Sequence, residues 1–165
     1  MSVLVRPATE GDLQAILDIH NDVLLKTTAI WDDEPEMMPV RQQWFRERQA
    51  QNFPVLVAEK DKQVAGFASY GTWRSRCCYK STVEHTIHIH NGFRGQGMGV
   101  GLMRGLIGIA IENGMHVMVG GMTATNAASI KMHRALGFTE CGRAKEVGFK
   151  FGAWLDLVLM QKILD

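Results

Sequence analysis

The most informative segment of this 165-residue chain is Ile87-His88-Ile89-His90-Asn91-Gly92-Phe93-Arg94-Gly95-Gln96-Gly97-Met98-Gly99. An alternating strand runs into a glycine-rich turn, and the turn opens onto a helix of mostly apolar and glycine residues. Such a turn gathers backbone N–H groups at a helix N-terminus, where they can receive a pyrophosphate. We therefore predict a diphosphate-binding loop between a central strand and a helix.

Apolar periodicity and turn residues divide the rest of the chain into helices and strands. Thr9 is the predicted cap of the first helix, with Asp12 in its first turn. The order β-α-α-β-β-β-α-β-α-β-β, without repeats, indicates one α/β domain over 1–165. The predicted helices are 9–26, 39–51, 97–113 and 127–136; the predicted strands are 2–6, 54–59, 64–70, 81–90, 116–120, 154–163 and one that begins at 137–138.

Composition narrows the class of protein. Eighteen Lys and Arg against 17 Asp and Glu leave a net charge of +1, which gives no general attraction to nucleic acid or acidic membranes. We expect neither partner, because no apolar run approaches the ~20 residues of a membrane span either. The N-terminus lacks the pattern of a signal peptide, so we expect a cytoplasmic protein. Cys77, Cys78 and Cys141 are expected to be reduced, partly buried thiols.

Two nucleotide-binding loops are rivals for the glycine-rich turn, and the sequence excludes both. A dinucleotide fingerprint needs an acidic residue about 20 residues later at the end of a second strand, but Glu112 falls at the end of a helix. A Walker loop needs Gly-Lys-Ser/Thr, which is absent. The spacing of Arg94, Gly97 and Gly99 instead resembles the R-x-x-G-x-G acyl-CoA loop of GCN5-related N-acetyltransferases.

The segment 125–138 extends this resemblance. It begins with Thr125-Asn126 and ends with Ala135-Leu136-Gly137-Phe138, like the helix that follows the acyl-CoA loop in the family. By that resemblance Asn126 binds the pantetheine arm and Ser129 faces the same ligand. The family often has tyrosine at the position of His133, where it protonates the leaving thiolate. A histidine can do the same, or His133 is a packing residue.

Four further stretches resemble the phosphinothricin and methionine sulfoximine N-acetyltransferases, so that the likeness covers nearly the whole chain. Trp73-Arg74-Ser75-Arg76 with Tyr79 and Val83-Glu84 matches their W-x-x-R…Y…VE, and Gly148-Phe149-Lys150 with Gly152, Trp154 and Asp156 matches their G-F-K-x-G-x-W-x-D. The other two are 26–35 and 131–138. The resemblance implies a twisted mixed sheet of about seven strands with helices on both faces. The strands 81–90 and 116–120 should splay to admit the pantetheine.

The resemblance also implies a reaction, namely direct transfer of acetyl from acetyl-CoA to the α-amine of a small amino acid such as methionine sulfone, methionine sulfoximine or phosphinothricin. It implies a homodimer with substrate sites near the subunit interface. Amides near Ile89 and His90 would polarise the thioester carbonyl. The expected cofactor-binding residues are His88, Ile89, His90, Arg94, Gly95, Gln96, Gly97, Met98, Gly99, Val100, Gly101, Asn126 and Ser129.

On the substrate side, Glu84 is the candidate base, because only a neutral amine attacks a thioester; otherwise it pairs with Lys80 or Arg76. Arg74 and Arg76 are placed to hold the substrate carboxylate, or either is a solvated loop charge, and Arg76 matches the family pattern better. Trp31 closes the pocket or belongs to the core. The expected substrate-binding residues are Trp31, Arg74, Ser75, Arg76, Glu84, His85, Thr86 and Ile87.

Three histidines on one strand raise the possibility of a metal site. Period-2 alternation places His88 and His90 on one face and His85 on the other, so we expect no metal. Two other functions stay open. One is acetylation of a different amine, such as a protein N-terminus, a polyamine or an aminoglycoside; the other is a non-catalytic acyl-CoA sensor.

Overall fold

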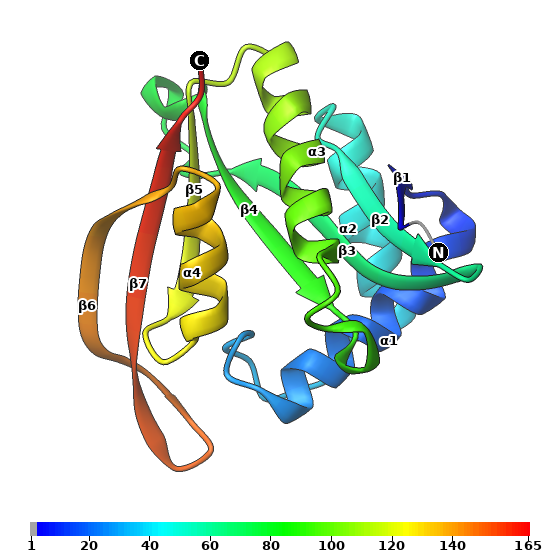
Figure 1. Ribbon diagram of the computed structural model, residues 1–165, viewed down its shortest axis with the longest axis horizontal. Coiled ribbons are helices and arrows are strands. Elements are labelled where there is room, and N and C mark those ends of the chain that lie inside the picture. Colours follow the sequence, from blue (N-terminus) through cyan, green and yellow to red (C-terminus); the bar gives the residue numbers. More distant parts are fainter. Residues whose placement is uncertain (1–2) are drawn as a thin grey trace.

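The computed structural model describes residues 3–165 and consists of a seven-stranded mixed sheet with helices on both faces (Figure 1). This confirms the predicted fold; Ser2, placed in the first predicted strand, lies outside the described residues. The strand order is β1-β2-β3-β4-β5-β7-β6, and every pair is antiparallel except β4–β5. The strands are β1 Leu4–Pro7, β2 Val55–Lys60, β3 Gln63–Thr72, β4 Thr82–Ile89, β5 Val117–Thr123, β6 Thr139–Lys150 and β7 Ala153–Ile163.

Four helices cover the sheet: α1 Leu13–Lys26, α2 Met38–Ala50, α3 Met98–Glu112 and α4 Ala127–Ala135. In Figure 1, α3 and α4 lie in front of the sheet, with α1 and α2 behind it. Alternation along β2 explains the two layers, because successive side chains point to opposite faces. Val55 and Val57 join the core under α1 and α2, whereas Leu56 and Ala58 join the core under α3.

A short 3-10 turn, Glu10–Asp12, leads into α1. The Asp12 carboxylate accepts hydrogen bonds from the Thr9 backbone N–H (2.7 Å) and from two nitrogens of Arg6 (2.8 and 2.9 Å). The start of the helix is therefore fixed by Thr9 and Asp12, as the sequence predicts.

The glycines of α3 bring this helix close to the sheet. A β-carbon on Gly105 would lie 2.9 Å from Leu56, and one on Gly101 would lie 3.4 Å from Val5. Glycine lowers helix stability by up to ~1 kcal/mol relative to alanine, and close packing on β1 and β2 offsets this cost. A β-carbon on Gly108 would meet no described atom within 4 Å, so this explanation covers the first two glycines alone.

The pairing of β4 with β5 stops halfway along both strands. Its three registered pairs are Thr82–Val117, Val83–Met118 and Glu84–Val119, although β4 runs on to Ile89 and β5 to Thr123. Figure 1 shows the two strands diverging beyond this point. The predicted splay is therefore present, and it begins at Glu84. Among residues 3–165, no helix is both long and apolar enough to span a membrane.

Candidate active site

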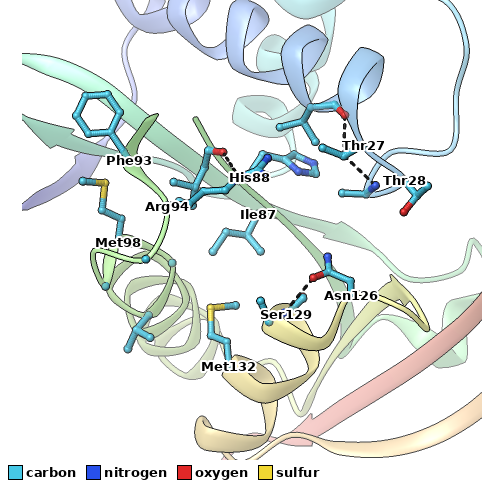
Figure 2. Close-up of a pocket in the computed structure, with 18 of the residues that line it drawn as sticks. Thr27, Thr28, Ile87, His88, Phe93, Arg94, Met98, Asn126, Ser129 and Met132 are labelled. Carbon is cyan, nitrogen blue, oxygen red and sulfur yellow. Dashed lines mark hydrogen bonds between the residues drawn. The ribbon is translucent and has the colours of Figure 1, made fainter. Parts of the chain in front are cut away.

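A cavity of about 560 Å³ lies at the gap between β4 and β5 (Figure 2). Because α1 lies on one face of the sheet and α3 and α4 on the other, a cavity lined by all three passes through the sheet. Its lining residues come from the C-terminal part of α1 and the loop after it, from the end of β4, and from the N-terminal turns of α3 and α4: Val23, Thr27, Thr28, Ala29, Ile87, His88, Ile89, Phe93, Arg94, Gly95, Gly97, Met98, Gly99, Val100, Thr125, Asn126, Ala128, Ser129 and Met132.

The glycine loop forms one wall of this cavity. Gly95 and Gly97 have φ values of 75° and 80°, which favour glycine, and a β-carbon on either would meet no described atom within 4 Å. The first backbone hydrogen bond of α3 runs from the Gly101 N–H to the Gly97 carbonyl, so the N–H groups before Gly101 have no partner within the helix. Arg94 is held to the strand by Nε donating to the Ile89 carbonyl (3.4 Å). These donors and this cation fit a pyrophosphate.

The first turn of α4 forms the facing wall. The Asn126 side-chain oxygen caps the helix by accepting from the Ser129 amide (3.2 Å), and both residues line the cavity (Figure 2). The Ser129 hydroxyl lies 3.7 Å from the sulfur of Met122. The wall therefore offers an amide and a hydroxyl, the groups that can bind the amide-containing pantetheine chain.

Three expected cofactor-binding residues lie away from the cavity. The His90 ring accepts from the Gly92 amide (3.2 Å) and packs on Phe93. Gln96 accepts a hydrogen bond from Lys60. Gly101 faces Val5 beneath α3. The other ten expected cofactor residues line the cavity.

Backbone amides at the end of β4 are directed into the gap. The His90 amide donates to the Ala65 carbonyl (2.8 Å) on β3. Because successive residues of a strand direct their amides to opposite edges, the amides of Ile87 and Ile89 face the β5 side, where pairing has ended. Ile87 and Ile89, rather than His90, thus supply the donors for a carbonyl in the gap.

Glu84 lies where the gap begins, on the face of the sheet that α1 covers. A β-carbon on Gly121 of β5 would lie 3.9 Å from its Oε1, so the carboxylate reaches toward the next strand. Burial raises the pKa of Glu84 above its ordinary value, and the positive charge of Arg74 partly opposes this rise. A half-buried carboxylate with a raised pKa suits proton transfer near neutral pH.

Trp31 occupies the same face of the sheet as Glu84. Its indole N–H donates to the Thr28 carbonyl and to the Thr123 hydroxyl, both at 2.9 Å. Residues 121 and 123 of β5 share the face that Glu84 approaches. Trp31 therefore forms a wall beside Glu84, although it is not among the cavity-lining residues.

The loop after β3 lies outside the cavity. Arg74, Ser75 and Arg76 are exposed, as is Thr86 on β4. The Arg74 guanidinium stands 5.1 Å from the Trp73 ring, and its charge acts on Glu84. Of the two candidate arginines, Arg74 is the one whose positive charge lowers the pKa of Glu84.

Comparison with known proteins agrees with this geometry. The family model described as the acetyltransferase (GNAT) family matches residues 13–138. The chain belongs to the GNAT acetyltransferases.

Individual relatives of this acetyltransferase match over almost their whole length. An L-methionine sulfoximine/L-methionine sulfone acetyltransferase from Pseudomonas aeruginosa is 46% identical over 100% of this chain and 96% of its own. A Salmonella typhimurium structure, described as a putative acetyltransferase with its cofactor acetyl-CoA, has a TM-score of 0.97, with 43% identity over 100% of this chain and 95% of that one. A Brucella melitensis structure, described as a ribosomal-protein-alanine N-acetyltransferase, has a TM-score of 0.95, with 47% identity over 98% and 99%.

His85 and His133 are placed away from the cavity of the acetyltransferase. His85 is 6% exposed and His133 is 1% exposed, and their rings stack between β4 and α4. Alternation turns the side chain of His85 to the face opposite Glu84. The His133 ring lies between α4 and β4, with its Nδ1 3.4 Å from the hydroxyl of the cavity-lining Ser129. The predicted contacts of His85 with substrate and of His133 with the leaving thiolate stay predictions.

His88 forms an uncharged part of the cavity wall in the acetyltransferase. Its ring lies 5.5 Å from Phe67 and 6.3 Å from His20, centroid to centroid. Burial lowers the pKa of His88, and the positive charges near it lower the pKa further. Among residues 3–165 no cluster of three or more His, Cys, Asp or Glu side chains is arranged to hold a metal ion.

Two positions that support the substrate side of the acetyltransferase were not among the predicted site residues. Lys150, 4% exposed, donates from Nζ to the carbonyls of Leu24 (2.6 Å) and Ile30 (2.7 Å). A β-carbon on Gly148 would lie 2.5 Å from the Trp31 ring. The G-F-K motif thus receives the loop that carries Trp31. The motif itself is visible in the sequence, but its contacts with Leu24, Ile30 and Trp31 are 117 to 126 residues away in the chain and leave no local signal.

Proposed function

We propose that this protein transfers the acetyl group of acetyl-CoA to the α-amino group of a small amino acid with a polar tetrahedral head group, such as methionine sulfone, methionine sulfoximine or phosphinothricin. The observation that carries the proposal is the cavity that crosses the sheet at the β4–β5 gap, beside Glu84. Acetyl-CoA approaching from α3 and α4 and an amine approaching from the α1 face would meet there. The name of the Pseudomonas relative supports the substrate class.

Glu84 is the proposed base. An amino acid arrives as an ammonium ion, which must lose a proton before its nitrogen can attack. The Glu84 carboxylate, deprotonated, takes that proton directly or through water, and its raised pKa makes it a better acceptor than an ordinary carboxylate. The amides of Ile87 and Ile89 donate to the oxygen on which negative charge develops.

Arg74 is the proposed partner of the substrate carboxylate, with Arg76 as the alternative from the same loop. A guanidinium can hold a carboxylate through two parallel hydrogen bonds. Arg74 has the stronger case because its charge acts on Glu84, so a carboxylate bound to it would bring the adjacent α-amine near the base. Trp31 closes this side of the site through its bonds to Thr28 and Thr123.

A thiol-release assay with acetyl-CoA tests the proposal on a panel of acceptors. The panel contains methionine sulfone, methionine sulfoximine, phosphinothricin, unmodified methionine, a polyamine and a peptide that begins with alanine. We expect turnover with the first three. The alanine peptide represents the second candidate function, acetylation of a protein N-terminus, which the name of the Brucella relative favours. Turnover of that peptide alone would replace our proposal, and acetyl-CoA binding without any turnover would indicate a sensor.

We also propose that the protein is a homodimer in the cytoplasm. Four apolar side chains near the turn of the β6–β7 hairpin are more than half exposed, and such patches often mark subunit contacts; they are Val147, Phe149, Phe151 and Trp154. Light scattering after size-exclusion chromatography should give twice the chain mass, and Phe149→Glu should reduce it. A single-chain mass for the unmodified protein would reject the dimer.

The exposure of the three cysteines supports the proposed location of the protein in the cytoplasm. Cys77, Cys78 and Cys141 are all exposed and unpaired, whereas the sequence suggested partial burial. Exposed thiols without disulfides are typical of a reducing compartment. Cell fractionation should therefore recover the protein with cytoplasmic markers, and recovery from an oxidising compartment would contradict this proposal.

A further inference from the structure

A pair of buried histidines fills the start of the β4–β5 gap on the α4 side. The rings of His85 and His133 stack with centroids 4.9 Å apart and planes 20° apart, and Phe138 meets both rings edge-on. Gly120 of β5 leaves the necessary space, since a β-carbon there would overlap Nε2 of His85. The pair therefore lies where the hydrogen bonds between the two strands stop.

The hydrogen-bond partners of the pair fix where each proton lies. His133 Nδ1 is 2.7 Å from the Ser129 carbonyl, which can only accept, so Nδ1 carries the hydrogen. Burial lowers the pKa of both histidines, so each is neutral at pH 7 and has one N–H. His133 Nε2 is then an acceptor, and His85 Nε2, 3.0 Å away, donates to it. His85 Nδ1 carries no hydrogen and has no partner among residues 3–165.

This chain of hydrogen bonds joins the two walls of the cavity. One end is His85 on β4, two residues before Ile87, and the other end is the carbonyl of Ser129 in the first turn of α4. Ser129 lines the cavity, and its amide is bonded to Asn126, which lines it too. A displacement of His133 would therefore move the two polar side chains that face the proposed pantetheine channel.

We propose that His85 and His133 act together as positioning residues, bridging the gap between β4 and α4 and so setting the distance between the two walls of the acetyl-CoA channel. The inference rests on the proposed acetyl-CoA function. It gives His133 a role other than proton donor to the thiolate. Its Nε2 faces His85 and its Nδ1 faces the Ser129 carbonyl, with the Ser129 hydroxyl also 3.4 Å from Nδ1, and the side chain is 1% exposed.

Kinetics of paired variants test the bridge. His85→Phe and His133→Phe keep an aromatic ring but break the chain of hydrogen bonds. We expect each to raise the KM for acetyl-CoA about tenfold and to leave kcat within about threefold. The double variant should be no worse than the poorer single variant, because both remove the same interaction. His133→Gln, whose amide both donates and accepts, should restore most of the affinity.

Two results would overturn the bridge. A loss of kcat in His133→Phe with unchanged KM, together with an altered basic limb in its pH profile and normal kinetics of His85→Phe, would make His133 a general acid. Strictly additive losses without rescue by His133→Gln would make the two residues independent packing positions. Should His133→Phe not fold, His85→Phe and His133→Gln give the same discrimination.

An NMR measurement tests the bridge without any acetyl-CoA. Long-range ¹H–¹⁵N spectra of the imidazoles in the unmodified protein should show the Nδ1–H tautomer for His133 and the Nε2–H tautomer for His85. Any other combination would refute the bridge. Failure of the protein to bind acetyl-CoA in calorimetry would instead refute the proposed function, so the two failures are distinguishable.

Discussion

The indole ring of Trp31 lies against Gly148, 117 residues later in the chain, so closely that a β-carbon at position 148 would be 2.5 Å from the ring. Trp31 stands beside Glu84 on the substrate face, whereas Gly148 belongs to the hairpin β6–β7. The absence of a side chain on one strand therefore determines where the aromatic wall of the site can lie.

Gly148→Ala should push Trp31 out of position. We expect kcat/KM for the amino acid to fall at least about tenfold, with little change in the KM for acetyl-CoA, because a small misplacement of a positioning group has large kinetic effects. Steady-state kinetics with each substrate varied in turn would measure this. Gly142→Ala on the same strand is the control, since a β-carbon there would be in ordinary contact, 3.8 Å from Leu159. Equal effects of the two substitutions would contradict the prediction.

Glu84→Gln should abolish the acidic limb of the pH profile. Burial raises the pKa of Glu84, and the carboxyl cannot accept a proton below that pKa. The kcat/KM of the unmodified enzyme should therefore rise with pH through a limb above the ordinary carboxylate range. The variant should be slower by about a hundredfold at neutral pH. Glu112→Gln, at the exposed end of α3, is the control. A variant with full activity at every pH would exclude Glu84 as the base.

The two arginines of the loop after β3 can be separated by substitution. Arg74→Gln should raise the KM for the amino acid at least about tenfold, since hydrogen bonds to charged groups contribute about 1.5–3 kcal/mol. It should also raise the pKa of Glu84 further, because the charge of Arg74 lowers that pKa. Arg76→Gln should have the smaller effect on KM. The reverse ranking, measured with the same acceptor, would transfer the carboxylate-binding role to Arg76.

Lys150→Met should destabilise the fold. The ammonium group of Lys150 satisfies the carbonyls of Leu24 and Ile30, and methionine would leave both without this donor. We expect the free energy of unfolding in urea to fall by about 3 kcal/mol. Lys145→Met changes an exposed lysine of the same strand and should be nearly neutral. A loss below about 1 kcal/mol would show that water replaces the ammonium group.

Asp12→Asn should lower stability in a pH-dependent way. The hydrogen bonds from Arg6 hold the pKa of Asp12 at about 2, below its usual 3.8. Because the folded pKa is the lower one, the ionised carboxylate contributes about 2 kcal/mol above pH 3.8, and this contribution is lost as the pH falls toward 2. Urea unfolding of both proteins across the acid range measures it. A constant difference would refute the linkage, and Asp18→Asn, an exposed change in α1, is the control.

Most of the fold could be predicted from local signals. Helix caps, glycine turns and alternating strands lie within a few residues of one another, so the elements and their order were obtained from the sequence. The mixed sheet and the splay came from resemblance, since the point where two strands part depends on contacts between distant residues. The start of the gap at Glu84 could be located once the register of β4 and β5 was known.

In the candidate site, too, the residues that could be predicted are those with a local sequence signal. The glycine loop and the start of α4 could be predicted as cavity-lining segments, because in both the residues that form the motif are themselves the residues that line the cavity. The sequence did not show that His85 and His133 are buried together between β4 and α4, because a motif position does not say whether a side chain faces the ligand or the sheet. Thr28 and Ala29 line the cavity, yet the resemblance of 26–35 does not say which of its residues face the ligand.

The parting of β4 and β5 leaves two inner edges in the middle of a continuous sheet. Beyond Glu84 and Val119, the registered pairing between the half-sheet β1–β4 and the half-sheet β5–β7 has ended, and three residue pairs join the two halves. A ligand that forms hydrogen bonds with both β4 and β5 would take the place of a strand between them and stiffen the connection between the two half-sheets. Amide hydrogen exchange in β4 and β5 should then slow together when the ligand binds, in segments that lie on either side of it.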